Sequence, residues 1–283
     1  MSSRLHLRKR NKLFYYFIYF AILTNVVFGQ SFTLVNFLGD FDNASSFSQY
    51  SSGFYVTDKG NNTVVKIDTS GNIEKIIGGY GWDESSFDNP TDVFAAPLKV
   101  FVSDKDNNRV QVFDRFLNYL FSIKSSDTFY PSNCAVSAQG DIFILDADNV
   151  SILKYDMSGH FIDNIGQISS GDFTLQNPKA IAVSDENNLY VADNNRLLIF
   201  DLFGSGKSII KLKFNPENLS VNNGMITLTT PKKVYLLNLQ KTKIREFDFS
   251  TQLENRNIID AEFSFNKLFV LTENQILVFN IPE

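Results

Sequence analysis

Short apolar runs alternate with polar turns along this chain, and one kind of run recurs six times. Each recurrence is rich in β-branched and aromatic residues, and the six runs end at Asp58, Asp104, Asp146, Asp193, Thr230 and Thr272. A second apolar run follows each of them and ends on Asp or Asn, at positions 68, 114, 156, 201, 238 and 280. Because both series advance in nearly the same steps, they predict an internal repeat of about 42 residues.

The first part of each repeat also has a recognisable pattern. The segments 90–95 (PTDVFA), 131–136 (PSNCAV) and 178–183 (PKAIAV) each open on proline and continue with small and apolar residues. Small side chains suit a strand that lies where several sheets crowd around an axis. The Asp and Asn markers suit the ends of strands, because their side chains bond backbone amides in turns. Each repeat is therefore expected to form four antiparallel strands.

The two ends of the chain predict how the repeats close. The last run, 276–280, reads as a third strand with no fourth strand after it, whereas 32–39 resembles the fourth-strand segment 72–79. An N-terminal strand that completes the last sheet would protect the sheet edges. The 283 residues less a 29-residue leader leave 254, or about 42 for each of six units. The sequence thus predicts an all-β fold, a six-bladed β-propeller over 30–283.

The repeat resembles a known family. The segment 104–113 (DKDNNRVQVF), preceded by Asn-Pro at 89–90 and a small, apolar run, is similar to the NHL repeat. The segments 78–90 and 166–178, which run from glycine to Phe and then Asn-Pro, look like the connections between NHL repeats in bacterial propellers. The resemblance is strong in the first four units and weaker in the last two, where Thr230 and Thr272 replace the aspartate. It implies a six-bladed NHL-type propeller.

The first 29 residues are typical of an export signal. Basic residues at 8–12 precede the apolar run 13–23, and Val27 and Gly29 provide the small residues of a cleavage site before Gln30. We therefore expect a signal peptide and a protein that is periplasmic or secreted. The alternative is an uncleaved membrane anchor, because 13–29 is just long enough to span a bilayer.

Charge argues against nucleic acid as a partner. The leader holds five of the 26 basic residues and no acidic one, so 21 basic residues face 31 acidic ones in the rest of the chain. Some NHL propellers bind RNA through a basic face, but proteins that bind nucleic acids neutralise phosphate with Lys and Arg. The exported part is acidic, and we expect no nucleic-acid partner.

The small number of histidine and cysteine residues excludes several kinds of disulfide, metal and catalytic site. Cys134 is the only cysteine, so no intramolecular disulfide can form. His160 is the only histidine outside the leader and lies in a predicted turn. A zinc site with three histidines cannot be built, and a Ser-His-Asp site would have only that turn histidine to use. No catalytic residue is assigned.

The longest connection, 79–89, is the best candidate for binding. It carries Tyr80, Trp82, Asp83 and Glu84, and Trp82 is the only tryptophan in the chain. Exposed aromatic residues beside acidic ones suit a protein or glycan partner. Arg109 and Arg196 complete the candidate set, although they recur at the same repeat position and a structural role suits them better.

An alternative reading involves a metal. Six-bladed propellers of the gluconolactonase type hold a divalent cation on the axis, and Asp92, Asn133 and Asp260 stand at or near the openings of predicted innermost strands. Hard oxygen ligands of this kind suit Ca²⁺. We expect a non-catalytic binding or scaffold propeller without a cofactor. The alternative is a divalent-metal-dependent hydrolase of the lactonase type.

Overall fold

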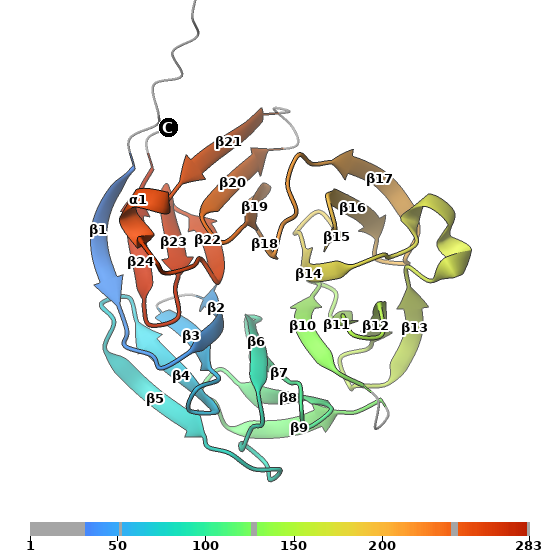
Figure 1. The fold of residues 1–283 in the computed structure, drawn as a ribbon. Helices are drawn as coiled ribbons and strands as arrows, with labels where there is room; N and C mark the ends of the chain where they lie inside the picture. Colours follow the sequence, from blue (N-terminus) through green and yellow to red (C-terminus); the bar gives the residue numbers. More distant parts are fainter. Residues whose placement is uncertain (1–31, 51–52, 126–128, 239–242, 282–283) are drawn as a thin grey trace, which may run out of the picture.

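Six four-stranded antiparallel sheets surround a common axis in the computed structural model, which describes residues 32–50, 53–125, 129–238 and 243–281. The predicted leader lies outside the described residues. The fold prediction is confirmed: the protein is a six-bladed β-propeller (Figure 1). In the part of the chain that the structure describes, no helix is long and apolar enough to cross a bilayer.

The blades follow the chain in order, and each runs from an innermost to an outermost strand. Blade 1 contains β2 (Ala44–Tyr50), β3 (Gly53–Asp58), β4 (Thr63–Asp68) and β5 (Ile73–Gly78). Blade 2 contains β6 (Pro90–Ala95), β7 (Lys99–Asp104), β8 (Arg109–Asp114) and β9 (Tyr119–Ile123). Blade 3 contains β10 (Pro131–Val136), β11 (Ile142–Asp146), β12 (Ser151–Tyr155) and β13 (Phe161–Ile165).

The second half repeats this order. Blade 4 contains β14 (Pro178–Val183), β15 (Asn188–Asp193), β16 (Arg196–Asp201) and β17 (Gly206–Lys211), preceded by the 3₁₀ helix η1 (Ile168–Phe173). Blade 5 contains β18 (Asn218–Asn222), β19 (Met225–Thr229), β20 (Lys233–Asn238) and β21 (Lys243–Asp248), followed by α1 (Ser250–Leu253). Blade 6 contains β22 (Asp260–Ser264), β23 (Lys267–Leu271) and β24 (Ile276–Asn280), and β1 (Thr33–Leu38) is its outermost strand.

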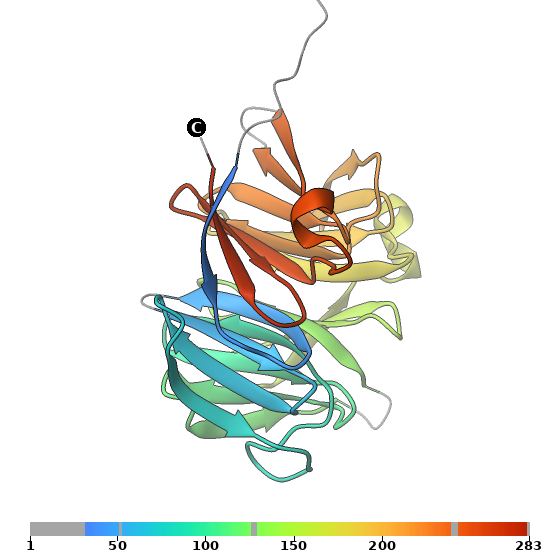
Figure 2. The same cartoon turned by 60° about the vertical axis from the view of Figure 1, so that its left-hand side comes forward.

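Strand β1 closes the ring, as the sequence predicts. It pairs antiparallel with β24, from Thr33 opposite Asn280 to Leu38 opposite Ile276, with one irregularity between Leu34 and Asn36. Figure 2 shows β1 running along the outer side of β24, so that the two ends of the described chain meet in one sheet. The closure joins segments more than 200 residues apart and makes the last blade as wide as the others.

The core lies between the blades. Six buried apolar clusters are present among the described residues, and each combines side chains of two neighbouring blades. The cluster between blades 6 and 1, for example, packs Phe47 and Phe54 against Phe269 and Leu271. Because every blade is buried against a neighbour on each side, its strands carry apolar residues on both faces.

The aspartate markers join each blade to the connection that precedes it. Asp58 accepts the backbone N–H groups of Asp42 and Asn43, at 3.1 and 2.9 Å, and Asp104 accepts that of Asp88 at 2.8 Å. In the last two blades Thr230 and Thr272 instead bond within their own turns, to residues 233 and 275. This local bonding explains how those blades keep their shape without the aspartate.

Candidate functional site

The candidate binding loop, residues 79–89, connects β5 of blade 1 to β6 of blade 2. Phe87 is fully buried and anchors it, and its N–H donates to the carbonyl of Gly79 at 2.9 Å. Gly78 has a φ of 120°, and a Cβ there would lie 2.5 Å from the carbonyl oxygen of Asn62. Only glycine fits such a close approach of two backbones. The loop therefore leaves the blade in a fixed direction.

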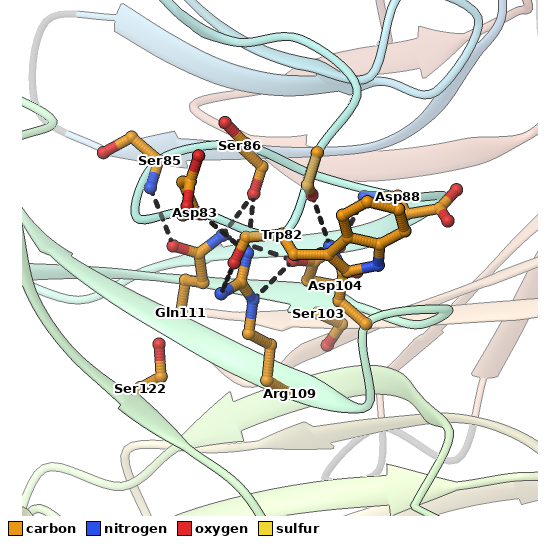
Figure 3. A network of polar contacts seen from close by, with 12 residues as sticks. Trp82, Asp83, Ser85, Ser86, Asp88, Ser103, Asp104, Arg109, Gln111 and Ser122 are labelled. Atoms are coloured by element: carbon orange, nitrogen blue, oxygen red, sulfur yellow. Dashed lines mark hydrogen bonds and ion pairs between the residues drawn. The ribbon is translucent and has the colours of Figure 1, made fainter. Parts of the chain in front are cut away.

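The side chain of Arg109 holds the loop in place through its hydrogen bonds. Its guanidinium donates to the carbonyls of Trp82, Asp83 and Ser86, at 2.8, 2.9 and 2.9 Å, and pairs with Asp104 at 2.8 Å (Figure 3). The arginine side chain is only 6% exposed and the aspartate is fully buried. A planar guanidinium has five N–H donors and satisfies four acceptors here, more than the three donors of a lysine could. Arg109 is thus a support of the loop, and it contributes no exposed charge to the surface.

Gln111 and Asn107 add further bonds to the same loop. The amide of Gln111 donates to the carbonyl of Ser86 at 2.7 Å and accepts the N–H of Ser85 at 3.0 Å. Asn107 donates to the carbonyl of Gly81 at 2.8 Å. The sequence pattern did not single out either residue, although Asn107 recurs as Asn61 and Asn149 three residues after the strand-end aspartate. Together the three side chains bond the carbonyls of Gly81, Trp82, Asp83 and Ser86 and the N–H of Ser85.

The loop presents two aromatic rings to solvent. Trp82 is 69% exposed and Tyr80 is 66% exposed, and their ring centroids lie 5.7 Å apart in an edge-to-face arrangement. Asp83 and Glu84 beside them are exposed, and neither forms an ion pair with another described residue. Exposed rings on a rigid loop are typical of a contact surface. We name Tyr80, Trp82, Asp83 and Glu84 the aromatic loop patch.

Arg196 does not join the aromatic loop patch. It begins β16 of blade 4 and holds a different connection, donating to the carbonyls of Asp172 and Thr174 at 3.0 Å each and pairing with Asp193. It therefore repeats the role of Arg109 two blades further on. The recurrence of Arg at this repeat position reflects support of the connection between blades.

The alternative metal residues do lie together, around the axis. The equivalent register positions of the six innermost strands form a set around the axis that we call the axial ring: Ser46, Asp92, Asn133, Ala180, Asn218 and Asp260. Asp92, Asn133 and Asp260 line one narrow hollow with Ser46. The structure thus brings together the three residues that the sequence singled out.

The axial ring joins one blade to the next. Asp92 accepts the N–H of Cys134 in the following blade at 2.8 Å, and the amide oxygen of Asn133 accepts that of Ile181 at 2.8 Å. Asp260 accepts the N–H of Phe47 at 3.4 Å, across the closure of the ring. Such bonds satisfy buried backbone donors at the crowded centre.

The carboxyl groups of the ring are strongly perturbed. Burial raises the pKa of Asp92 to about 6, and burial together with the nearby Asp92 raises the pKa of Asp260 to about 7. The hydroxyl of Ser46 lies 2.8 Å from Asp92 and 3.4 Å from Asp260, so it bridges the two side chains. Two carboxylates in one dry space repel each other, which favours a shared proton.

These bonds make the ring a poor fit for a calcium ion. The side-chain oxygens of Asp92, Asn133 and Asp260 already accept hydrogen bonds from backbone amides or from Ser46. Ca²⁺ requires six to eight oxygen ligands. Among the described residues, no group of three or more His, Cys, Asp or Glu side chains is arranged to hold a metal ion. The observed arrangement suits a structural joint between blades.

Glu262, two residues after Asp260 on β22, is a channel residue that the sequence analysis missed. It lines the channel below the axial ring, and among the described residues its carboxyl accepts a hydrogen bond from the N–H of Gln49 alone, at 3.3 Å. Burial and the charge of Asp260 raise the pKa of Glu262 well above its ordinary value. The alternation of a strand could have found it, because residues two apart share a face.

The fold and its channel define the class: a closed six-bladed β-propeller with joined inner strands. Comparison with solved structures agrees. A streptogramin B lyase superposes with a TM-score of 0.65 at 13% identity, over 89% of this chain and 98% of that one. A catalytically inactive histidine-to-alanine variant of virginiamycin B lyase from Staphylococcus aureus, with quinupristin, gives 0.63 at 13% identity, over 89% of this chain and 100% of that one. At such low identity, these similarities show the fold alone.

A curated protein matches about half of the chain in sequence. Protein brain tumor of Drosophila melanogaster is 27% identical over 139 residues, which are 46% of this chain and 13% of that protein. The match thus spans a small part of that relative's length. No family model matches the chain.

Proposed function

We propose that this protein is a non-catalytic binding propeller of the NHL-repeat type that acts outside the cytoplasm and contacts a protein or glycan through the aromatic loop patch. The observation that carries the proposal is the pair of exposed rings, Tyr80 and Trp82, on a loop that Arg109 holds in place. The partial match to Protein brain tumor and the repeat pattern support the NHL assignment. The leader sequence supports export.

Rigidity is what makes the aromatic loop patch suitable for binding. Large aromatic side chains supply much contact area at a low cost in side-chain entropy, and tryptophan and tyrosine are enriched among residues that dominate binding energy. A loop that is already ordered loses little further entropy when a partner docks. The buried bonds from Arg109 and Gln111 provide that order before binding.

The position of the histidine favours binding over a lyase activity. One of the structural neighbours is a lyase variant made catalytically inactive by replacing a histidine. In this chain His160 is the only histidine outside the leader. It is 80% exposed in the turn between β12 and β13, where it bonds Asp156 at 3.1 Å. That turn lies between the two outer strands of blade 3, away from the axial channel.

The alternative is a metal-dependent hydrolase of the lactonase type, with Ca²⁺ on the axis. The convergence of Asp92, Asn133 and Asp260 on one hollow is the observation in its favour. Their oxygens, however, are engaged in joining the blades. A stoichiometric divalent cation in the purified protein, lost in Asp92→Ala, would favour this alternative.

Capture of partners tests the proposed function. Tagged protein, exposed to the native envelope or medium and to a glycan array, should retain a partner that Trp82→Ala loses. Phe203→Ala is the matched control. Like Trp82, Phe203 is strongly exposed, at 84%, but it lies in the turn between β16 and β17 on the opposite face. If the Trp82→Ala variant still retains the partner, the binding site lies elsewhere on the protein. An intact mass equal to that of a chain beginning at Gln30 would support export.

A further inference from the structure

The axial channel widens on the face opposite the aromatic loop patch. Each innermost strand begins on the face that carries the aromatic loop patch, as β6 does at Pro90. It ends on the opposite face, at the turn into the second strand of its blade. A hollow of about 480 Å³ opens there, lined by residues from all six blades. This volume falls in the range of about 300–1,000 Å³ that is usual for small-molecule sites. We call it the lower pocket.

We propose that the lower pocket binds a small organic cation, an ammonium group on an apolar body, with Glu262 as its counter-ion. The proposal concerns a different face from the aromatic loop patch, and it stands or falls independently of the proposed function. Three observations support the cation site: the cavity itself, its acidic and apolar lining, and a side-chain acceptor in the cavity that has no hydrogen-bond donor.

The charged side chains of the lower pocket are all acidic. Glu262 and Asp185 line it, from β22 and from the turn between β14 and β15, and no Lys, Arg or His is among its lining residues. Asp92 and Asp260 line the channel immediately above. Every charged group that faces Glu262 in the channel is therefore a carboxyl, so the pocket would repel anions and attract cations.

Two polar groups at this site lack strong partners. The carboxyl of Glu262 has one bond, from the N–H of Gln49, and forms no ion pair with a described residue. The side-chain oxygen of Gln49, which also lines the pocket, is buried without a hydrogen bond. Both are acceptors, and an ammonium group would supply the donors that they lack.

The rest of the wall mixes apolar side chains with serine and asparagine, and it includes two aromatic rings. Phe94 and Val183 are among the apolar residues, and Phe265, which is 85% exposed, also lines the pocket. The neutral polar lining residues are Ser48, Ser137, Ser220, Asn222, Asn223 and Ser264. Aromatic faces attract ammonium groups, and apolar surface favours the body of an organic ligand. The lining thus suits a ligand with a cationic end and an apolar body.

Binding should release a proton. Because burial and the charge of Asp260 raise the pKa of Glu262 well above its ordinary value, the empty site favours the protonated form of Glu262, and a bound cation would favour the ionised form. Affinity for a cation should therefore rise with pH, by up to about tenfold per pH unit below the pKa.

Calorimetry with benzylamine tests the proposal, with benzyl alcohol and benzoate as neutral and anionic comparators. We expect wild-type protein to bind benzylamine in preference to both, with proton release at pH 6 measured in two buffers of different ionisation enthalpy. Glu262→Gln should weaken benzylamine binding about tenfold or more. Glu217→Gln is the matched control, because Glu217 lies at the other mouth of the channel, and it should bind as wild type.

Three results would overturn the proposal: no detectable benzylamine binding, equal binding of benzyl alcohol, or unchanged binding in a folded Glu262→Gln variant. Thermal unfolding checks that the variant folds. If it does not fold, the wild-type measurements decide, because binding without ligand preference or without proton release contradicts a site on Glu262.

Discussion

Arg109 and Arg196 show how a single residue type supports this fold. Each follows a strand-end aspartate, pairs with it, and turns its remaining donors to carbonyls of the connection that enters its blade. A buried guanidinium is tolerated because acceptors surround most of its N–H groups. The Nε of Arg196 is the exception, since it is buried without a hydrogen bond to a described residue. The residue thus links a strand, a turn and a loop that are separate in the sequence.

Arg109→Ala should lower the free energy of unfolding by about 3–5 kcal/mol, because it removes the cation that pairs with the buried Asp104 and a donor to three loop carbonyls. Urea unfolding measures the loss, and the fluorescence anisotropy of Trp82, the only tryptophan, reports the freed loop. Arg115→Ala, at an exposed arginine of the same blade, should change stability by no more than about 0.5 kcal/mol. An unchanged urea midpoint in Arg109→Ala would contradict the supporting role.

At the scale of the element, β1 is the strand on which closure depends. It is an edge strand whose side chains are mostly exposed, with Leu38 buried at its end. Its contribution therefore comes largely from the ladder with β24. Without it, β24 would present an unpaired edge to solvent and to other chains.

Proline substitutions in β1 test this ladder. The N–H of Phe37 donates to the side chain of Asn36, so it points away from β24, and the N–H of Asn36 must point toward it. Asn36→Pro should therefore lower the free energy of unfolding by about 1–3 kcal/mol, whereas Phe37→Pro, the matched control, should cost clearly less. Both variants lose the same side-chain bond. Equal unfolding midpoints would show that the ladder is not what holds β1.

At the scale of the whole molecule, the axial ring exists only because six blades meet. Each member lies on its own strand, and bonds between neighbours join the blades. Ala180 offers no side-chain acceptor, and Asn218 bonds its own neighbour, so the joints on either side of blade 5 lack this bond. The ring thus concentrates buried carboxyl groups on one side of the axis.

The protein should become less stable as pH rises from about 4 to about 7. Asp92 and Asp260 have pKa values raised from 3.8 to about 6 and about 7, so the folded state binds more protons than the unfolded state in that window. Thermal unfolding at several pH values should show this slope, and Asp260→Asn should flatten it. Asp68→Asn is the matched control and should leave the slope between pH 4 and 7 nearly unchanged, because hydrogen bonds from Asn72 lower the pKa of Asp68, and its contribution to stability therefore changes only below about pH 4. If the wild-type protein instead became more stable as pH rises in this range, burial of these carboxyl groups would not be the cause of its pH dependence.

The sequence by itself determined the fold, the blade number and the closure. Repeat markers such as Asp58 and Asp104 act through local turn chemistry, and strand alternation is also local, so both are readable along the chain. The exposed aromatic residues of the 79–89 loop were readable in the same way.

Only the tertiary structure decided which side chains meet. It placed Arg109 beneath the loop and Arg196 on another blade, and it gathered Asp92, Asn133 and Asp260 around one axis with their oxygens occupied. It also placed Glu262 in a pocket whose lining residues include no Lys, Arg or His. These facts depend on contacts between residues far apart in the chain, and on the direction in which each side chain points. The repeat pattern specifies that a position faces the axis, but the partners it meets there come from other repeats.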